Sequence, residues 1–363
     1  MEEWIKVFIF LYLHNQEHAV DLIKNIRKEI RAVDYLKITS NDYYILFLSC
    51  YLHDISMVKI PSKEQFILDT GKSDKIAIDF KDELREEIPK DMISIKKLLI
   101  NFYKKVDEFY EDAIRGPHAK DSAQEIRTRE ELNFLDDSLR DNVARIAEAH
   151  GYDILDVYNV KSNASNHLVS MKFDKILLRF ADLLDMSSYR VSKPILNHNL
   201  EEMSPVSAFH WISHLLTKGY RLETRYDIVK DEKNDGACLY PKNIRENIIL
   251  HINVAMSQLS KIKIKNKCKK GAIVPSTISC NGFTLRCGEC CSNEECNFLC
   301  KWFSNKNNYL IEELGALKDY LNRTKSNFFS SDIWIEVHIV DNKELDEKQF
   351  EILKNYLCEN DEM

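Results

Sequence analysis

The chain has 363 residues, of which 44% are hydrophobic, and a formal net charge of −7 at pH 7. A chain of this length can bury one large core and a smaller one, which corresponds to one to three domains. The negative charge argues against broad non-specific binding to nucleic acid. The first residues are partly acidic and lead to no small-residue cleavage site, and no apolar run reaches the roughly 18 residues of a membrane span. We therefore expect a cytoplasmic protein with no membrane partner.

The first half of the chain has the spacing of amphipathic helices. Apolar periodicity predicts helices within five stretches, namely 2–34, 41–56, 91–114, 121–150 and 170–190. Ser40 or Asn41 is the expected N-cap of the second helix, because short polar side chains accept hydrogen bonds from the first free N–H groups. Nine glycines in the whole chain and these long periodic segments predict a mainly α fold with an all-helical bundle.

Beyond Pro194 the pattern changes to that of an α+β domain. The expected elements are strands over 220–229 and 333–340, a strand or a helix over 248–254, and a helix over 346–357. We therefore predict a helical domain over residues 1–200, followed by a smaller α+β accessory domain over 201–363.

Cysteines are concentrated in one insert of the accessory domain. Seven of the ten cysteines lie within residues 268–300. Two pairs have the spacing of chelating thiolates that share one tetrahedral ion, namely Cys287 with Cys290 and Cys296 with Cys300. Structural zinc is our first interpretation. An iron–sulfur cluster, disulfides and free thiols stay open as alternatives.

The candidate chemistry lies in residues 46–56, where an apolar run leads to the adjacent pair His53 and Asp54. Imidazole nitrogen and carboxylate oxygen together suit Mn²⁺, Fe²⁺, Co²⁺, Ni²⁺ or Zn²⁺ better than Ca²⁺. One such dipeptide is a weak signal, so the interpretation depends on partners elsewhere. The chain supplies them in the order His, His-Asp, His, His, Asp, as His18, His53, Asp54, His118, His150 and Asp182.

In this order the sequence resembles the HD superfamily of metal-dependent phosphohydrolases, over about residues 1–200. The most distinctive stretch is Leu-Arg-Phe-Ala-Asp-Leu-Leu-Asp at 178–185, followed by Arg190, which is similar to the closing helix of that family. The resemblance implies a helical bundle around one or two divalent metals. The first metal would be held by His18, His53, Asp54 and Asp182, and a second by His118 and His150 with Asp54 as the bridging carboxylate.

Further residues are expected around the metals. Asp185 and Asp21 lie one helical turn from a ligand each, so they would accept the second N–H of a histidine, or would be solvated acids. His14 lies one turn before His18, where a substrate-facing group belongs. The side chains expected to supply phosphate charge or to stack on a base are Arg115, Lys120, Lys172, Arg179, Arg190 and Tyr189.

Three of these residues have an equally plausible structural role. Arg115 and Lys120 fit surface charge beside a turn, and His150 before Gly151 fits the C-terminal cap of a helix.

The function that these residues predict is hydrolysis of a nucleotide phosphoester or phosphoanhydride by metal-activated water. A dNTP triphosphohydrolase and a nucleotide phosphodiesterase both fit, and either activity would suit bacterial antiviral defence. The alternative is a catalytically silent nucleotide-sensing or partner-binding regulatory protein. The complete ligand set favours the enzyme, because Asp54 and Asp182 would repel each other without a cation. A nucleotide substrate, a regulatory protein partner and a homo-oligomer are compatible with this interpretation.

Overall fold

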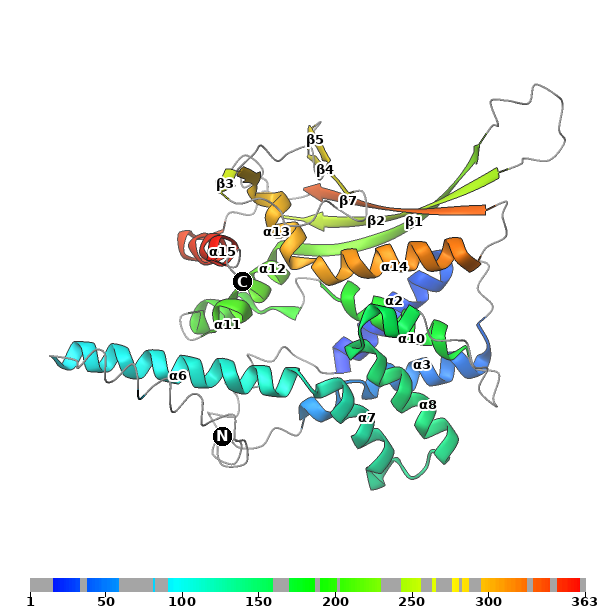
Figure 1. Ribbon diagram of the computed structural model, residues 1–363, viewed down its shortest axis with the longest axis horizontal. Coiled ribbons are helices and arrows are strands. Elements are labelled where there is room, and N and C mark those ends of the chain that lie inside the picture. Colours follow the sequence, from blue (N-terminus) through cyan, green and yellow to red (C-terminus); the bar gives the residue numbers. More distant parts are fainter. Residues whose placement is uncertain are drawn as a thin grey trace.

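The computed structural model consists of a helical part and a five-stranded sheet that is covered by helices on one face (Figure 1). The residues described are 16–32, 38–58, 81, 91–158, 170–186, 190–200, 203–229, 243–255, 263–265, 276–280, 283–286, 295–324, 329–339 and 345–359. The predicted combination of a mainly α bundle with a smaller α+β part is confirmed.

The helical part contains a helix within every stretch in which periodicity predicted one. Its helices are α2 (Gln16–Ala32), α3 (Ser40–Leu52), α6 (Met92–Arg115), α7 (His118–Thr128), α8 (Asp137–Glu148), α9 (Ile154–Tyr158) and α10 (Met171–Leu184). Short 3₁₀ turns connect them at η1 (Ile55–Val58), η2 (Glu130–Leu132) and η3 (Ala149–Gly151).

Helix α3 is capped by Thr39, so the prediction of Ser40 or Asn41 as its cap was wrong. The Thr39 hydroxyl accepts a hydrogen bond from the Asp42 N–H at 3.2 Å, and the Asp42 carboxylate accepts one from the Thr39 N–H at 2.7 Å. This reciprocal capping box requires an acid or amide three residues after the cap. Ser40 and Asn41 have tyrosines at that position, so only Thr39 completes the box.

The second part contains five further helices and the strands. The helices are α11 (Lys193–Asn199), α12 (Pro205–Leu216), α13 (Phe298–Lys306), α14 (Asn308–Thr324) and the C-terminal α15 (Glu347–Glu359). The strands are β1 (Thr217–Val229), β2 (Asn243–Val254), β3 (Lys263–Lys265), β4 (Ser276–Cys280), β5 (Phe283–Arg286), β6 (Glu295–Asn297) and β7 (Phe329–Ile339). The stretch 248–254, for which the sequence left helix and strand open, is therefore strand.

The large sheet has the strand order β1-β2-β7-β4-β5. Strand β2 pairs antiparallel with β1 and parallel with β7, and β7 pairs parallel with β4. Alternate residues of β2 and β7 form one buried apolar face, which packs against the helices; its members are Ile248, Leu250, Ile252, Ile333, Ile335 and Val337. The opposite face carries the intervening residues, because side chains alternate across a strand.

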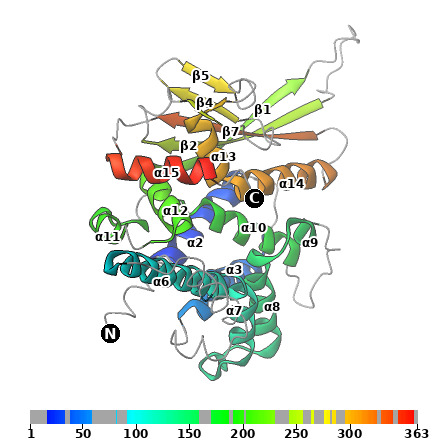
Figure 2. The same ribbon diagram turned by 60° about the vertical axis from the view of Figure 1, so that its left-hand side comes forward.

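Helix α10 lies in the middle of the molecule, below helix α14 (Figure 2), and it contributes side chains to two apolar cores. Leu177, Leu178 and Ala181 belong to a core made with α2, α3, α7 and α8. Phe180 and Leu184 belong to a larger core that continues through α12 and the sheet to α15. This larger core includes residues on both sides of position 200, and the proposed domain boundary there stays a prediction.

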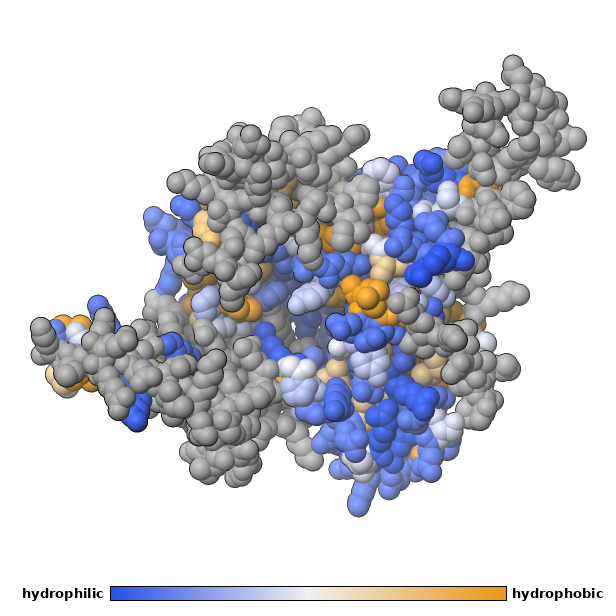
Figure 3. Space-filling view, in the orientation of Figure 1, coloured by the Kyte–Doolittle hydropathy of each residue, from blue (hydrophilic) through white to orange (hydrophobic). Residues whose placement is uncertain are grey.

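The surface over α7 and α8 is mainly hydrophilic (Figure 3). Among the residues that the structure describes, no helix combines the length and the hydropathy needed to cross a membrane.

Candidate metal centre

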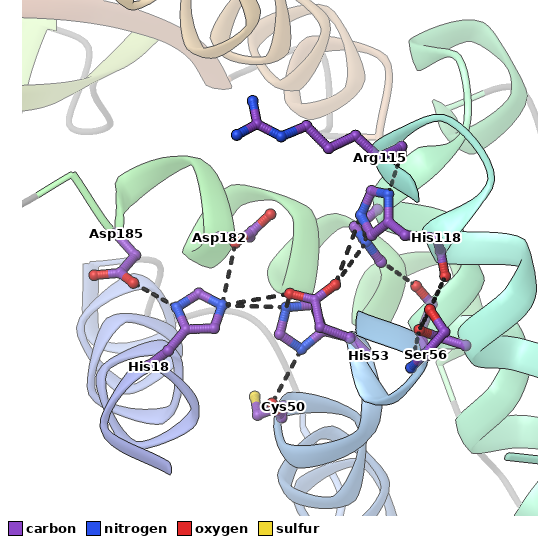
Figure 4. Close-up of polar contacts among 12 residues, drawn as sticks. His18, Cys50, His53, Ser56, Arg115, His118, Asp182 and Asp185 are labelled. Atoms are coloured by element: carbon purple, nitrogen blue, oxygen red, sulfur yellow. Dashed lines mark hydrogen bonds and ion pairs between the residues drawn. The ribbon is translucent and has the colours of Figure 1, made fainter. Parts of the chain in front are cut away.

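Five chain segments bring all six predicted ligands to one place (Figure 4). They are His18 on α2, His53 and Asp54 just after α3, His118 at the start of α7, His150 in η3, and Asp182 near the end of α10. His18, His53 and Asp54 are buried, and His118, His150 and Asp182 are half-buried. The site therefore lies at the edge of the helical core.

Asp54 lies between two groups of ligands. One oxygen, Oδ2, is 3.0 Å from His53 Nε2 and 4.0 Å from His18 Nε2. The other oxygen, Oδ1, is 3.4 Å from His150 Nε2 and 3.6 Å from His118 Nε2. Each oxygen of this carboxylate thus faces a different pair of imidazoles, which is the arrangement of a carboxylate that bridges two cations.

The two groups are compact. His18 Nε2 lies 3.2 Å from His53 Nε2 and 3.6 Å from Asp182 Oδ1. His150 Nε2 lies 2.8 Å from His118 Nε2. The first group consists of His18, His53 and Asp182, and the second consists of Asp54, His118 and His150. Within each group, the ligand atoms are all within 4.8 Å of one another.

The second ring nitrogen of three histidines is held by the backbone. Nδ1 faces the carbonyl oxygen three residues earlier in His53 with Cys50 (3.1 Å), in His150 with Ala147 (2.5 Å) and in His118 with Arg115. Because a carbonyl oxygen only accepts hydrogen bonds, Nδ1 must carry the hydrogen in each ring. The Nε2 lone pairs of the neutral rings are therefore directed into the site, as in histidines that bind metals.

The fourth histidine is oriented by a carboxylate. Asp185 Oδ2 lies 2.5 Å from His18 Nδ1, so this carboxylate accepts the second N–H of His18, as predicted. Arg190 Nη1 lies 3.2 Å from the same carboxylate oxygen of Asp185. Asp21 pairs instead with Lys24 at 2.7 Å on the exposed side of α2.

The donor set fits divalent transition metals. Two Nε2 lone pairs 2.8 Å apart, in His118 and His150, repel each other unless a cation or a proton lies between them. The same holds for His18 and His53 at 3.2 Å. Four imidazole nitrogens and two carboxylates form the kind of ligand set used by Mn, Fe, Co, Ni and Zn. These buried groups could therefore hold metal ions.

Electrostatic effects within the site favour the deprotonated form, which binds metals, in three of the ligands. Burial lowers the pKa of His18, and burial together with the charge of His150 lowers the pKa of His118. Burial alone would raise the pKa of Asp182, but the charges of the surrounding histidines lower it. Burial alone would lower the pKa of His53, but the negative charge of the adjacent Asp54 outweighs burial and raises this pKa to about 9. Metal binding would therefore displace a proton from His53.

Arg179 has a structural role, so the expectation that it supplies phosphate charge was wrong. Its Nη1 donates to three backbone carbonyl oxygens in and beside η3, those of Ala149 (2.8 Å), His150 (3.2 Å) and Tyr152 (2.6 Å). Its other nitrogens contact Glu313. The Arg179 guanidinium therefore stabilises the turn that carries His150.

Two further contacts that sequence patterns did not single out hold the second group of ligands. The Ser56 hydroxyl donates to the His118 carbonyl oxygen at 3.0 Å and lies 2.8 Å from the Ser122 hydroxyl. A Cβ atom on Gly151 would lie 2.5 Å from Ala119 Cβ, so only glycine allows η3 to approach α7 this closely. His150 lies in the turn after α8 and faces the site. Helix α8 ends with Ala149 as its C-cap and Gly151 does not have a positive φ, so the alternative of a cap with Gly151 at C′ was wrong.

The other candidate substrate residues have different positions. Arg115 is half-buried, and its Nη2 lies 3.5 Å from Ser207 Oγ. Lys120 is exposed on α7, and Lys172 Nζ lies 4.7 Å from the centre of the Tyr320 ring. His14 and Tyr189 lie outside the described residues.

The cysteine site stays a prediction. Cys287 and Cys290 lie outside the described residues, and Cys296 belongs to β6. Cys300 is buried in α13, within the larger apolar core.

Comparison with known proteins agrees with this geometry. The HD-CE family model matches residues 8–245. No curated protein and no solved structure shows significant similarity to the chain. The matched stretch covers more than half of the 363 residues and includes all six residues of the centre. The chain therefore belongs to the HD-CE family and is an HD-domain protein.

Proposed function

We propose that this protein is a metal-dependent phosphohydrolase that acts on nucleotides. The observation that supports this most directly is the division of the two Asp54 oxygens between two groups of ligands. His18, His53, Asp54 and Asp182 would hold one divalent cation, and Asp54, His118 and His150 a second. Two cations held in this way would polarise phosphoryl oxygens and lower the pKa of bound water.

The residues of the chain itself contribute orientation and charge. The carbonyl groups behind His53, His118 and His150 fix the three rings, so little reorganisation is needed when a cation binds. Asp185 does the same for His18 and, with Arg190, extends a polar network away from the ligands.

Two basic side chains near Asp185, Arg190 and Lys306, would attract an anionic substrate. Arg190 contacts Asp185, and the charges of Arg190 and Asp185 both act on Lys306. Lys306 Nζ lies 3.2 Å from His214 Nε2. Lys306 belongs to α13, so the C-terminal part of the chain would contribute to phosphate binding. A nucleotide carries several phosphate charges, which Arg190 and Lys306 would attract.

The proposal includes the identity of the metals and of the substrate. Mn²⁺, Fe²⁺, Co²⁺ or Ni²⁺ would occupy the centre formed by the six His and Asp residues, which we call the HD site, and zinc would occupy the cysteine segment. The substrate would be a dNTP, which yields triphosphate, or a phosphodiester, which yields a monophosphate, and either would suit antiviral defence.

The test is a hydrolysis assay on the full chain with Mn²⁺, Co²⁺ or Ni²⁺ and a panel of dNTPs, cyclic nucleotides and short oligonucleotides. We expect phosphate, pyrophosphate or triphosphate release that chelator abolishes and Asp182→Asn reduces by at least about tenfold. His198→Gln, at an exposed histidine of α11, is the matched control and should keep full activity.

Absence of turnover with every metal would overturn the enzyme proposal. If calorimetry then showed nucleotide binding without hydrolysis, the protein would be a nucleotide-sensing regulator, which is the alternative function.

A further inference from the structure

A second cluster of histidine and glutamate side chains lies on the sheet, on the face opposite the helices. Residues of β2 and β7 at paired positions form it: His251 is opposite Glu336, and His338 follows two residues later on the same face. On β1, Glu223 lies diagonally across from His251. The cluster does not share any residue with the HD site.

The distances within the cluster are those of metal ligands. His251 Nδ1 is 2.8 Å from His338 Nε2 and 3.2 Å from Glu336 Oε2, and the last two atoms are 3.7 Å apart. Bonds of 2.0–2.1 Å to a tetrahedral ion would space ligand atoms about 3.4 Å apart. The three atoms therefore need to move by only a few tenths of an ångström to share one ion.

The buried histidine of the cluster is also oriented for this role. His251 is 3% exposed, and its Nε2 lies 3.1 Å from Glu223 Oε2. Glu223 is itself held by Arg225 Nε at 2.6 Å and by Arg221 Nη1 at 3.0 Å. A carboxylate that accepts Nε2–H leaves the Nδ1 lone pair directed at His338 and Glu336, as in carboxylate–histidine–zinc arrangements.

We propose that His251, Glu336 and His338 bind a divalent transition ion, with Zn²⁺ as the ion that such a set favours. Two imidazoles and one carboxylate leave a fourth tetrahedral position for water. The ion would join β2 to β7 at the centre of the sheet and would offset the charge of two neighbouring glutamates. This proposal does not depend on the function proposed for the HD site.

The experiment is a count of zinc per chain in the full-length protein after chelator treatment, reloading with Zn²⁺ and removal of excess metal. Glu336 and His338 are each about one-third exposed, so the double variant Glu336→Gln, His338→Gln should fold. We expect it to lose one equivalent of zinc relative to the wild type. His198→Gln, the matched histidine control, should lose none, and Asp182→Asn should keep this equivalent even if the HD proposal fails.

Cobalt substitution separates this site from a cysteine site. The absorption difference between wild type and double variant should show visible bands of nitrogen- and oxygen-bound Co²⁺ without the near-ultraviolet band of thiolate ligands. Equal zinc content in wild type and double variant would overturn the proposal, and so would a difference spectrum with a thiolate band.

Discussion

Arg179 and Glu313 form a buried ion pair that joins the helix of Asp182 to the C-terminal part of the chain. Nε and Nη2 of Arg179 lie 3.1 and 2.9 Å from the same Glu313 oxygen. Since Arg179 also holds the η3 turn, the pair connects α14 to the position of His150.

Removal of this carboxylate should destabilise the fold strongly. Glu313→Ala leaves the Arg179 charge without its buried partner, which costs about 3–5 kcal/mol of unfolding free energy. Urea denaturation measures the loss. Asp319→Ala, at an exposed acid of the same helix, should change stability by no more than about 0.5 kcal/mol. Equal effects of the two substitutions would contradict the role of the pair.

The contact between Asp185 and His18 should control metal affinity. Asp185→Asn removes the charged acceptor of the His18 N–H, so affinity at the first metal position should fall about 10–100-fold. A Mn²⁺ titration followed by calorimetry measures the change. Asp21→Asn, at the predicted acid that contacts only Lys24 among the contacts described, is the matched control and should bind metal as the wild type does. Unchanged affinity in Asp185→Asn would show that the contact does not serve the ligand.

Gly151 should be intolerant of even a methyl group. In Gly151→Ala the new Cβ would meet Ala119 Cβ at 2.5 Å, so η3 and α7 must separate. Overpacking of this kind costs about 1–3 kcal/mol, and it should weaken the second metal position, where His118 and His150 meet. Thermal unfolding and metal stoichiometry measure the two effects. In the double variant Ala119→Gly, Gly151→Ala the methyl group has room, and both properties should recover.

Asp174 should make the protein less stable as pH rises. Burial raises the pKa of Asp174 to about 9, and the charge of Asp42 adds to this. Between its ordinary pKa of 3.8 and about 9, the folded state keeps a proton that the unfolded state has lost. Stability from this group is therefore full below pH 3.8 and declines as pH rises towards 9.

Asp174→Asn resembles the protonated acid and should remove this dependence. We expect a gain of about 1 kcal/mol or more in unfolding free energy at pH 8 and little change at pH 4. Chemical denaturation at both pH values is the measurement, and Asp156→Asn on the exposed side of α9 is the control. An equal gain at both pH values would mean that the titration is not responsible.

Lys306 should make substrate binding pH-dependent, if the proposed function holds. Burial lowers the pKa of Lys306 to about 7, and the charge of Arg190 contributes. The ammonium charge is then present below pH 7 and lost above it, so KM for a nucleotide should rise from pH 6 to pH 9. Lys306→Arg keeps its charge and should flatten this rise, whereas Lys306→Gln should raise KM at pH 6 about tenfold or more. An unchanged pH profile in Lys306→Arg would remove Lys306 from the binding site.

The sequence predicted the helices because apolar periodicity is a local signal, and it predicted the six converging residues because their order resembles that of the HD superfamily. His18 lies on the buried face of α2, and the pair His53 and Asp54 follows directly from the end of α3. Ser40 and Asn41 are residue types that often cap helices, but the cap of α3 is Thr39 because only Thr39 forms a capping box with Asp42.

Long-range partners were not predictable from the sequence. An arginine is a common phosphate ligand, so the sequence alone made Arg179 a candidate. Only the contact with Glu313, 134 residues later, shows that its charge is already paired. The cluster of His251 and His338 depends on strand register in the same way, since the two residues are 87 positions apart.

The position of α10 between the two apolar cores bears on how the chain can be divided. Phe180 and Leu184 face one core while Leu177 and Ala181 face the other. A fragment that ended near residue 200 would expose the first pair to water and lose Glu313 as well. Limited proteolysis should accordingly release no stable N-terminal fragment, and the metal ligands and the sheet should unfold in one cooperative transition.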